Sequence, residues 1–338
     1  MGQSNKAALL RVKMGFTHAA PATILACNMT DLILHHFETS PFSEKIRRVL
    51  AYKRMAWKSV LVPPMLPKPD VVELTGGYRR TPFLQIGADV YCDTALICEV
   101  LERLQPLPSL YLEPVQGLAR ILAHWADTTL FWAAVAGPRN PARMNGGMPK
   151  AAQAFAEDRK AMFGSMKLLA SPDAQAALRC HVQRLCDTLG DQHFLLGPAP
   201  SVADFAAYHP LWLTRIRHPV EADILGQIDN LSEWMDRMQD LGTQISQPFD
   251  AERAIAVAAA AQPLPVEDGP LGGTKFVDRH GIALGEPVTV TAESFGPEAT
   301  PGVLVAATDD HYTLRRSAAR AGTVHVHFPR TGYVLART

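Results

Sequence analysis

The chain has 338 residues, of which 47% are hydrophobic, and its 33 basic and 33 acidic residues give a formal net charge of zero. This length predicts two domains with an appendage, and the apolar content is sufficient for a large core. Zero net charge excludes a global field that would recruit nucleic acid or a membrane surface, so we expect neither as a partner. The five cysteines are an odd number without metal-site spacing, which favours a reducing cytoplasm.

The first 28 residues combine basic positions with a short apolar run, as a signal peptide does, but His18 and Pro21 interrupt that run. We therefore expect a disordered leader or an over-long start over residues 1–28. No run of about 18 apolar residues occurs in the sequence, so no membrane span is expected.

A short apolar run, Leu32 to Leu34, precedes a helix that begins at Pro41, and this order places Ser40 at the helix N-cap. The N-cap faces unpaired backbone N–H groups, and with the helix dipole these stabilise a negatively charged sulfur or oxygen. A Ser-Pro helix start is also a common structural cap. The motif therefore indicates chemistry only together with the segment that follows.

That second segment predicts a hairpin followed by a helix. A strand over Phe83 to Ile86 meets a tight turn, and a second short strand ends at Cys92. Asp93 and Thr94 then begin an amphipathic helix with apolar residues at helical spacing.

Taken in order, Ser40-Pro41-Phe42, Thr81-Pro82-Phe83-Leu84 and Asp93-Thr94 resemble the N-terminal, thioredoxin-like half of the glutathione transferase superfamily. The resemblance covers residues 30–106 well and the helical region to about residue 261 more loosely. It is similar to the serine-type, zeta-like classes, and the Ser-Pro-Phe sequence matches the Cys-Pro-Phe pattern of the omega-like class.

The resemblance implies that Ser40 activates glutathione as a co-substrate. A hydroxyl that donates to the sulfur near a helix N-terminus favours the thiolate, which is the nucleophile. Thr39 and Ser43 remain alternatives, because a small shift in the alignment would exchange them with Ser40. No Cys-x-x-Cys pair exists, so a dithiol oxidoreductase is disfavoured.

The same resemblance implies the rest of a glutathione site. The backbone of Thr81, before a cis Pro82, would pair with the cysteinyl part of glutathione. Asp93 would take the γ-glutamyl ammonium, and Thr94 with the first N–H groups of its helix would take the γ-glutamyl carboxylate. Arg80 would meet the glycyl carboxylate, unless it is simply solvated.

Residues 112–261 predict an all-helical second domain. Its helical patterns cover residues 115–136, 148–169, 173–190, 202–217, 228–241 and 249–261. Ser201 and Asp204 match the family's N-capping motif, whose role is folding. The electrophile would bind between the two domains, against Phe42, His124, Phe131 and Trp132, although aromatic residues at helical spacing more often belong to a core.

Residues 262–270 read as a linker, and beyond it the apolar period changes to two. Five short strands in residues 271–338 predict a small, SH3-like or OB-like β-barrel that ordinary glutathione transferases lack. The expected strands are Pro287–Glu293, Val303–Thr308, Tyr312–Arg316, Thr323–Phe328 and Tyr333–Ala336. His325 and His327 share a strand face at a spacing that permits metal ligation, but no third ligand is evident, so no metal is expected.

The fold class expected is therefore α/β plus all-α with an added C-terminal β domain. The function expected is a cytoplasmic, homodimeric glutathione transferase-like enzyme that attacks a small apolar electrophile by conjugation, dehalogenation, ether cleavage or isomerisation. The alternative is a non-catalytic binding or adaptor protein that works through the C-terminal β domain, whose last 28 residues contain five arginines and no carboxylate side chain.

Overall fold

The computed structural model describes residues 31–136, 150–217, 229–272 and 275–338. The leader expected over residues 1–28 lies outside these residues. None of the described helices is long and apolar enough to cross a membrane.

The N-terminal part of the chain has the strand arrangement of a thioredoxin-like fold. Its strands are β1 (Leu32–His36), β2 (Ala56–Leu61), β3 (Phe83–Ile86) and β4 (Asp89–Cys92). Strand β1 pairs in parallel with β2 and antiparallel with β3, and β3 pairs antiparallel with β4. The helices are α1 (Pro41–Tyr52), α2 (Pro69–Thr75) and α3 (Thr94–Leu104). The predicted hairpin and both predicted helix starts are confirmed.

The two faces of this sheet belong to two different apolar clusters. Leu34 joins the cluster that contains residues of α1, α3 and the helical domain. Its neighbour Ile33 points to the other face and joins residues of α2 and of the C-terminal region. Because side chains alternate along a strand, the sheet is buried on both sides.

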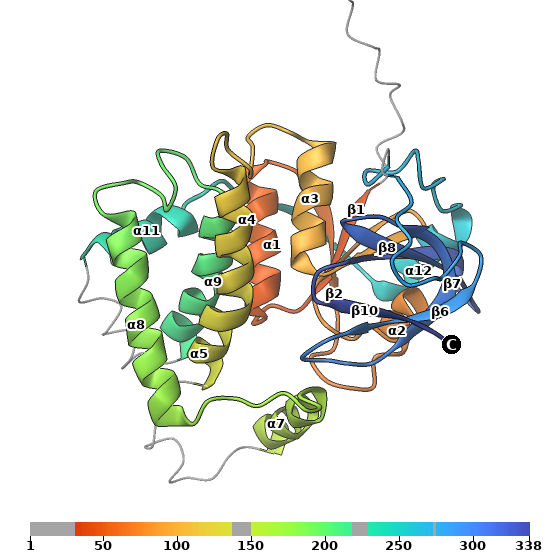
Figure 1. Ribbon diagram of the computed structural model, residues 1–338, viewed down its shortest axis with the longest axis horizontal. Coiled ribbons are helices and arrows are strands. Elements are labelled where there is room, and N and C mark those ends of the chain that lie inside the picture. Colours follow the sequence, from red (N-terminus) through yellow and green to blue (C-terminus); the bar gives the residue numbers. More distant parts are fainter. Residues whose placement is uncertain (1–30, 137–149, 218–228, 273–274) are drawn as a thin grey trace, which may run out of the picture. The chain divides into compact units, whose positions relative to one another are not determined.

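The helical domain packs on the α1 side of the sheet (Figure 1). Its elements are α4 (Gln116–Trp125), the π-helical turn η1 (Ala126–Leu130), α5 (Phe131–Ala136), α7 (Lys150–Met162), α8 (Ser171–Leu189), α9 (Val202–Arg217) and α11 (Asp229–Gln239). The prediction of one continuous α-helix over residues 115–136 is therefore wrong in one respect. A π-helical turn divides the segment into α4 and α5. Such turns are rare and frequently mark functional sites.

One strand was missed by the sequence patterns. Strand β5 (Ile245–Phe249) extends the sheet by pairing in parallel with β2, and α12 (Ala251–Ala260) follows it directly. Pro248 lies inside β5, which is tolerated because β5 is the edge strand of the sheet. A short, polar strand that contains proline carries little of the usual period-two signal.

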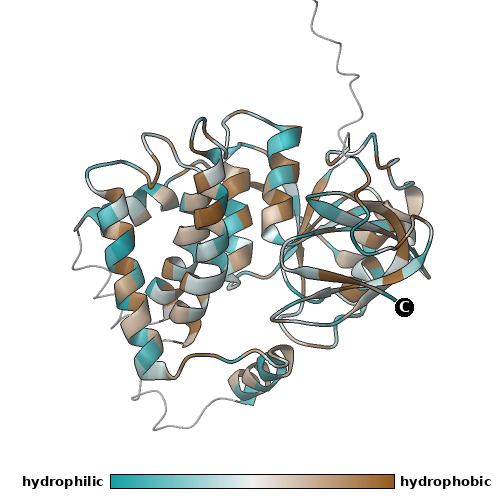
Figure 2. Cartoon of the chain, viewed as in Figure 1, coloured by the Kyte–Doolittle hydropathy of each residue, from teal (hydrophilic) through white to brown (hydrophobic). Residues whose placement is uncertain are grey.

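All five strands expected in the C-terminal region are present, and hydrophobic residues run through them in Figure 2. They are β6 (Pro287–Ala292), β7 (Thr300–Ala307), β8 (His311–Ala318), β9 (Gly322–Pro329) and β10 (Tyr333–Arg337). Their order is β10-β6-β7-β8-β9, in which the last strand returns to pair with the first.

The C-terminal strands continue the N-terminal sheet. Strand β9 pairs in parallel with β4, where Val90 lies opposite Val326, and the result is one sheet of ten strands. The apolar cluster on this side contains Phe83 and Val90 together with Val326 and Phe328. An edge strand such as β4 carries unpaired N–H and C=O groups, and β9 satisfies them.

Asp204 holds the start of α9 in the way the capping motif implies. Its buried carboxylate accepts hydrogen bonds from the backbone N–H groups of Leu195 (2.8 Å) and Ser201 (2.9 Å). It also accepts from the Ser201 hydroxyl (3.0 Å) and from Trp234 Nε1 (3.0 Å). One carboxylate therefore ties a loop, a helix start and α11 together.

Replacing Asp204 should be costly, since several buried donors would lose their partner. We expect Asp204→Ala to lower the free energy of unfolding by about 2–4 kcal/mol, measured by urea denaturation. The control is Asp236→Ala, which removes an exposed ion pair with Arg215 and should cost less than about 1 kcal/mol. Equal effects of the two substitutions would contradict this interpretation.

Candidate active site

Three predicted site segments meet at one end of the sheet. Ser40 follows the carboxyl end of β1, while Thr81 and Pro82 precede the amino end of β3. Because β1 and β3 are antiparallel, with His35 opposite Phe83, these two ends are adjacent. Strand β4 ends at Cys92, opposite Phe83, so Asp93 emerges at the same place.

Ser40 is the N-cap of α1, as expected. Its Oγ accepts a hydrogen bond from the backbone N–H of Ser43 at 3.2 Å, and Pro41 occupies the first helical turn. No hydrogen bond donated by this hydroxyl is found among the residues that the structure describes. The hydroxyl proton is therefore available to a ligand, although the residue is only 3% exposed.

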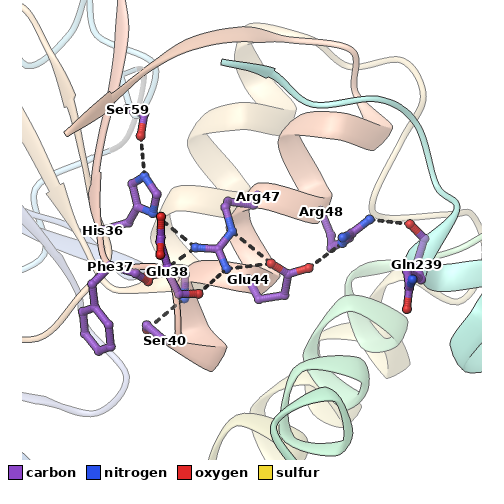
Figure 3. A network of polar contacts seen from close by, with 10 residues as sticks. His36, Phe37, Glu38, Ser40, Glu44, Arg47, Arg48, Ser59 and Gln239 are labelled. Atoms are coloured by element: carbon purple, nitrogen blue, oxygen red, sulfur yellow. Dashed lines mark hydrogen bonds and ion pairs between the residues drawn. The ribbon is translucent and has the colours of Figure 1, made fainter. Parts of the chain in front are cut away.

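Arg47 fixes the loop that presents Ser40 (Figure 3). Its guanidinium donates to the carbonyl oxygen of Glu38 (2.9 Å) and pairs with the Glu44 carboxylate (2.7 Å). It also contacts Nδ1 of His36 at 3.2 Å. Sequence reasoning missed this residue, although a glutamate followed three residues later by an arginine on a helix is a usable signal of an ion pair.

The His36 ring is held neutral beside this network. Burial, followed by the charge of Arg47, lowers the pKa of His36 to about 3. A neutral ring can accept from Arg47 at Nδ1 and donate from Nε2 to Ser59 Oγ, which lies 2.8 Å away. Burial likewise lowers the pKa of the adjacent His35 to about 4.

These two histidines predict a loss of stability in mild acid. Their folded pKa values lie below the ordinary 6.5, so the unfolded chain binds more protons between pH 6.5 and about 4. Their contribution is complete above pH 6.5 and is lost as the pH falls, by about 1 kcal/mol per pH unit for each ring.

Urea denaturation between pH 7 and pH 5 measures this slope. His36→Gln should reduce the change of unfolding free energy with pH by the contribution of one histidine. His124→Gln, at an exposed position on α4, should leave that change as in the wild type. Identical slopes in all three proteins would show that the buried histidines do not titrate as described.

The remaining residues of the expected site have the predicted local geometry. The Thr81–Pro82 peptide is cis. Asp93 is the N-cap of α3, accepts the Ala95 N–H at 2.9 Å, and has a positive φ of 76°. A non-glycine residue in this region is strained, and such strain is concentrated at functional sites.

The C-terminal β region reaches into this cluster. The hydroxyl of Tyr333, on β10, donates to the Asp93 carboxylate at 3.0 Å, while the Asp93 backbone N–H donates to Tyr78 Oη at 3.1 Å. Arg80 binds the carbonyl oxygen of Phe295 and lies 3.5 Å from Tyr333 Oη. Arg80 is thus engaged within the chain, since the β region covers the position where a free guanidinium would face solvent.

A buried ion pair joins the first helix to the helical domain. Lys45 Nζ lies 2.5 Å from Asp127 Oδ2 and 3.2 Å from Thr94 Oγ1. His209 Nε2 lies 2.9 Å from Asp127 Oδ1. Although burial alone would raise the pKa of Asp127, the charge of Lys45 and the hydrogen bond from His209 hold it below its ordinary value.

Breaking this pair should destabilise the protein strongly. We expect Lys45→Met to lower the free energy of unfolding by about 3–5 kcal/mol, because the buried Asp127 carboxylate would lose its cation. Arg279→Met is the control, since Arg279 and Asp309 form an exposed pair whose loss should cost below about 1 kcal/mol. Chemical denaturation near pH 7 compares the variants, and a small effect of Lys45→Met would contradict the prediction.

Three of the four expected substrate contacts are brought together. Phe42 packs against Phe131 (centroid distance 4.7 Å), which packs against Trp132 (4.8 Å). Phe295 from the C-terminal β region closes on Trp132 at 5.2 Å. His124 was expected in this group but is exposed on α4, before the π-helical turn.

Two family descriptions match the chain. Residues 34–109 match the glutathione S-transferase N-terminal domain, and residues 152–237 match the glutathione S-transferase C-terminal domain. The fold and the site geometry define the same class of protein. The chain therefore belongs to the glutathione transferase superfamily, with a large additional C-terminal β region.

One solved structure agrees with this assignment, and two others are more distantly similar. A GST-like protein from Pseudomonas syringae shares 35% identity, with a TM-score of 0.70, over 92% of this chain and 100% of that chain. A Methylobacillus flagellatus glutathione S-transferase with glutathione bound shares 23% identity over 62% of this chain and 95% of its own (TM-score 0.47). The β-etherase LigF of a Sphingobium strain shares 21% sequence identity over 63% of this chain and 96% of its own, with a TM-score of 0.45. A comparison with curated proteins found no match.

Proposed function

We propose that the protein is a glutathione-dependent transferase in which Ser40 activates the thiol. The observation that carries the proposal is the N-cap geometry: Ser40 Oγ accepts from the Ser43 N–H, and its own proton has no acceptor within the described residues. A thiolate placed before α1 would receive this proton as a hydrogen bond and would lie in the positive end of the helix dipole. Both effects lower the pKa of a bound thiol.

The other residues hold the tripeptide in this proposal. The backbone of Thr81 pairs with the cysteinyl unit, and Asp93 offers a carboxylate to the γ-glutamyl ammonium. Lys45 donates to Thr94 Oγ1, so the Thr94 O–H is directed away from Lys45 and towards the γ-glutamyl carboxylate. Glutathione bound to a family member supports this choice of co-substrate.

The second substrate is a small apolar electrophile that lies against Phe42, Phe131 and Trp132. Two of these rings are partly exposed, and Phe131 is nearly buried. A β-etherase among the structural relatives is consistent with ether cleavage as one form of this chemistry.

The enzyme is a homodimer in this proposal. Support comes from aliphatic side chains that lie exposed on α3, on α4 and between them. They are Leu104, Leu107, Leu118 and Ile121. Exposed aliphatic side chains that gather on one surface typically mediate association.

A second candidate function, a non-catalytic binding protein, is favoured by a different observation. Ser40 is only 3% exposed, and the Asp93 carboxylate already accepts the Tyr333 hydroxyl. In this case the C-terminal β region would occupy the glutathione site with its own side chains, and the working surface would lie elsewhere on the β region.

Ser40→Ala tests the enzyme against the binding protein. With reduced glutathione, calorimetry of the wild type should detect binding, and ultraviolet absorbance should detect thiolate near pH 7. Loss of one hydrogen bond to a charged sulfur should reduce kcat/KM with an aromatic chloride electrophile about 10- to 100-fold and abolish the thiolate signal.

Ser43→Ala is the matched control, because the Ser43 hydroxyl is buried and makes no hydrogen bond among the described residues. This variant should retain the wild-type thiolate signal. Absence of glutathione binding by the wild type would overturn the enzyme proposal, and equal losses in both variants would overturn the role of Ser40.

A further inference from the structure

The pairing of β4 with β9 brings together three metal-ligating side chains that are far apart in the sequence. Asp89 lies opposite His325, and Tyr91 lies opposite His327, in the parallel register of the two strands. His325 and His327 are two residues apart on β9 and therefore share one face with Asp89. Sequence reasoning found no third ligand because Asp89 belongs to a strand 238 residues before His327.

The distances within this cluster suit a small metal ion. His327 Nε2 lies 2.9 Å and His325 Nδ1 lies 3.7 Å from Asp89 Oδ1, and one ligand atom from each residue lies within 4.8 Å of the others. Zinc binds imidazole nitrogen and carboxylate oxygen at about 2.0–2.2 Å, which places tetrahedral ligands about 3.3 Å apart. The cluster is therefore somewhat wider than a closed zinc site, and the side chains would draw together around the ion.

One of the three candidate ligand atoms has no hydrogen-bond partner among the described residues. Nδ1 of His325 is buried and makes no hydrogen bond in the part of the chain that the structure describes, and the residue is 9% exposed. Buried polar atoms are usually satisfied, so this imidazole nitrogen beside a carboxylate is open to a ligand.

The surrounding groups can orient the other two ligands. Thr313 Oγ1 lies 2.9 Å from His327 Nδ1, so it can accept the ring N–H and leave the Nε2 lone pair for a metal. The Leu264 N–H donates to Asp89 Oδ2 at 2.9 Å and fixes the carboxylate. A cavity of about 10 Å³ lies beside Asp89 and His327, but His325 does not line it.

We propose that Asp89, His325 and His327 form a zinc-binding site at the junction of β4 and β9. Two imidazoles and one carboxylate are a donor set that Zn²⁺ accepts, whereas Mg²⁺ and Ca²⁺ prefer oxygen donors. Because two ligands lie on β9 and one on β4, the metal cross-links the C-terminal β region to the thioredoxin-like strands. Without metal, His327 donates directly to Asp89.

The test is titration of the full chain, without a histidine tag and freed of metal by chelation, with Zn²⁺ alone. Calorimetry should give one zinc per chain, and Co²⁺ should give the visible absorption of a low-coordinate site. His325→Ala should weaken zinc binding by at least about 100-fold, since loss of a group that only hydrogen-bonds to a metal ligand already costs about 10- to 100-fold.

His325→Ala is suited to this test, because it removes the unpartnered Nδ1, although it also removes an interaction of the ring with the Leu264 backbone. The control is His280→Ala at an exposed position, which should bind zinc as the wild type does. Zinc should also raise the melting temperature of the wild type and of His280→Ala but not that of His325→Ala. Absence of binding, or binding unchanged by His325→Ala, would show that the cluster is a hydrogen-bond network only.

Discussion

The parallel pairing of β4 with β9 is the constraint on which the rest of this structure depends. In a thioredoxin-like sheet β4 is an edge strand, whose unpaired backbone groups need a partner. Here β9 is that partner, and the apolar side chains of both strands share one cluster. Once β9 is placed, β10 brings Tyr333 to the Asp93 carboxylate, and the segment between β6 and β7 brings Phe295 to Trp132. The added region is therefore part of the site and part of the core.

Charge is organised around the site so that the dipole of α1 acts with little competition. Arg47 is paired with Glu44, and Lys45 is paired with Asp127 beneath Thr94. Paired charges of opposite sign largely cancel at a distance, whereas the N–H groups at the start of α1 keep their partial positive charge. Ser40 lies at that start. The pair of Arg47 and Glu44 also fixes the loop before Ser40, and the pair of Lys45 and Asp127 joins α1 to the helical domain. The same side chains therefore neutralise one another's charge and hold these segments in place.

Local patterns predicted much of the fold but little of its assembly. The cap at Ser40, the helix start at Asp93 and the C-terminal strands follow from turn residues and apolar periods within short windows. The resemblance to the glutathione transferase superfamily supplied the cis bond before Pro82. Contacts such as Tyr333 with Asp93 join positions 240 residues apart, and no periodicity encodes them. Strand β5 and the π-helical turn were missed because tertiary packing, rather than local preference, decides both.

The order in which the strands enter the sheet also has a consequence for synthesis of the chain. Asp89 is translated long before His327, 238 residues later, so the backbone of β4 lacks its partner while most of the protein is being made. Contacts of such long range close slowly, and an uncovered strand edge is a template for pairing with other chains. Wherever the N-terminal sheet forms before β9 has been made, the β4 edge is open during that interval. Chaperone capture during translation is most useful at that stage, before β9 emerges and closes the edge.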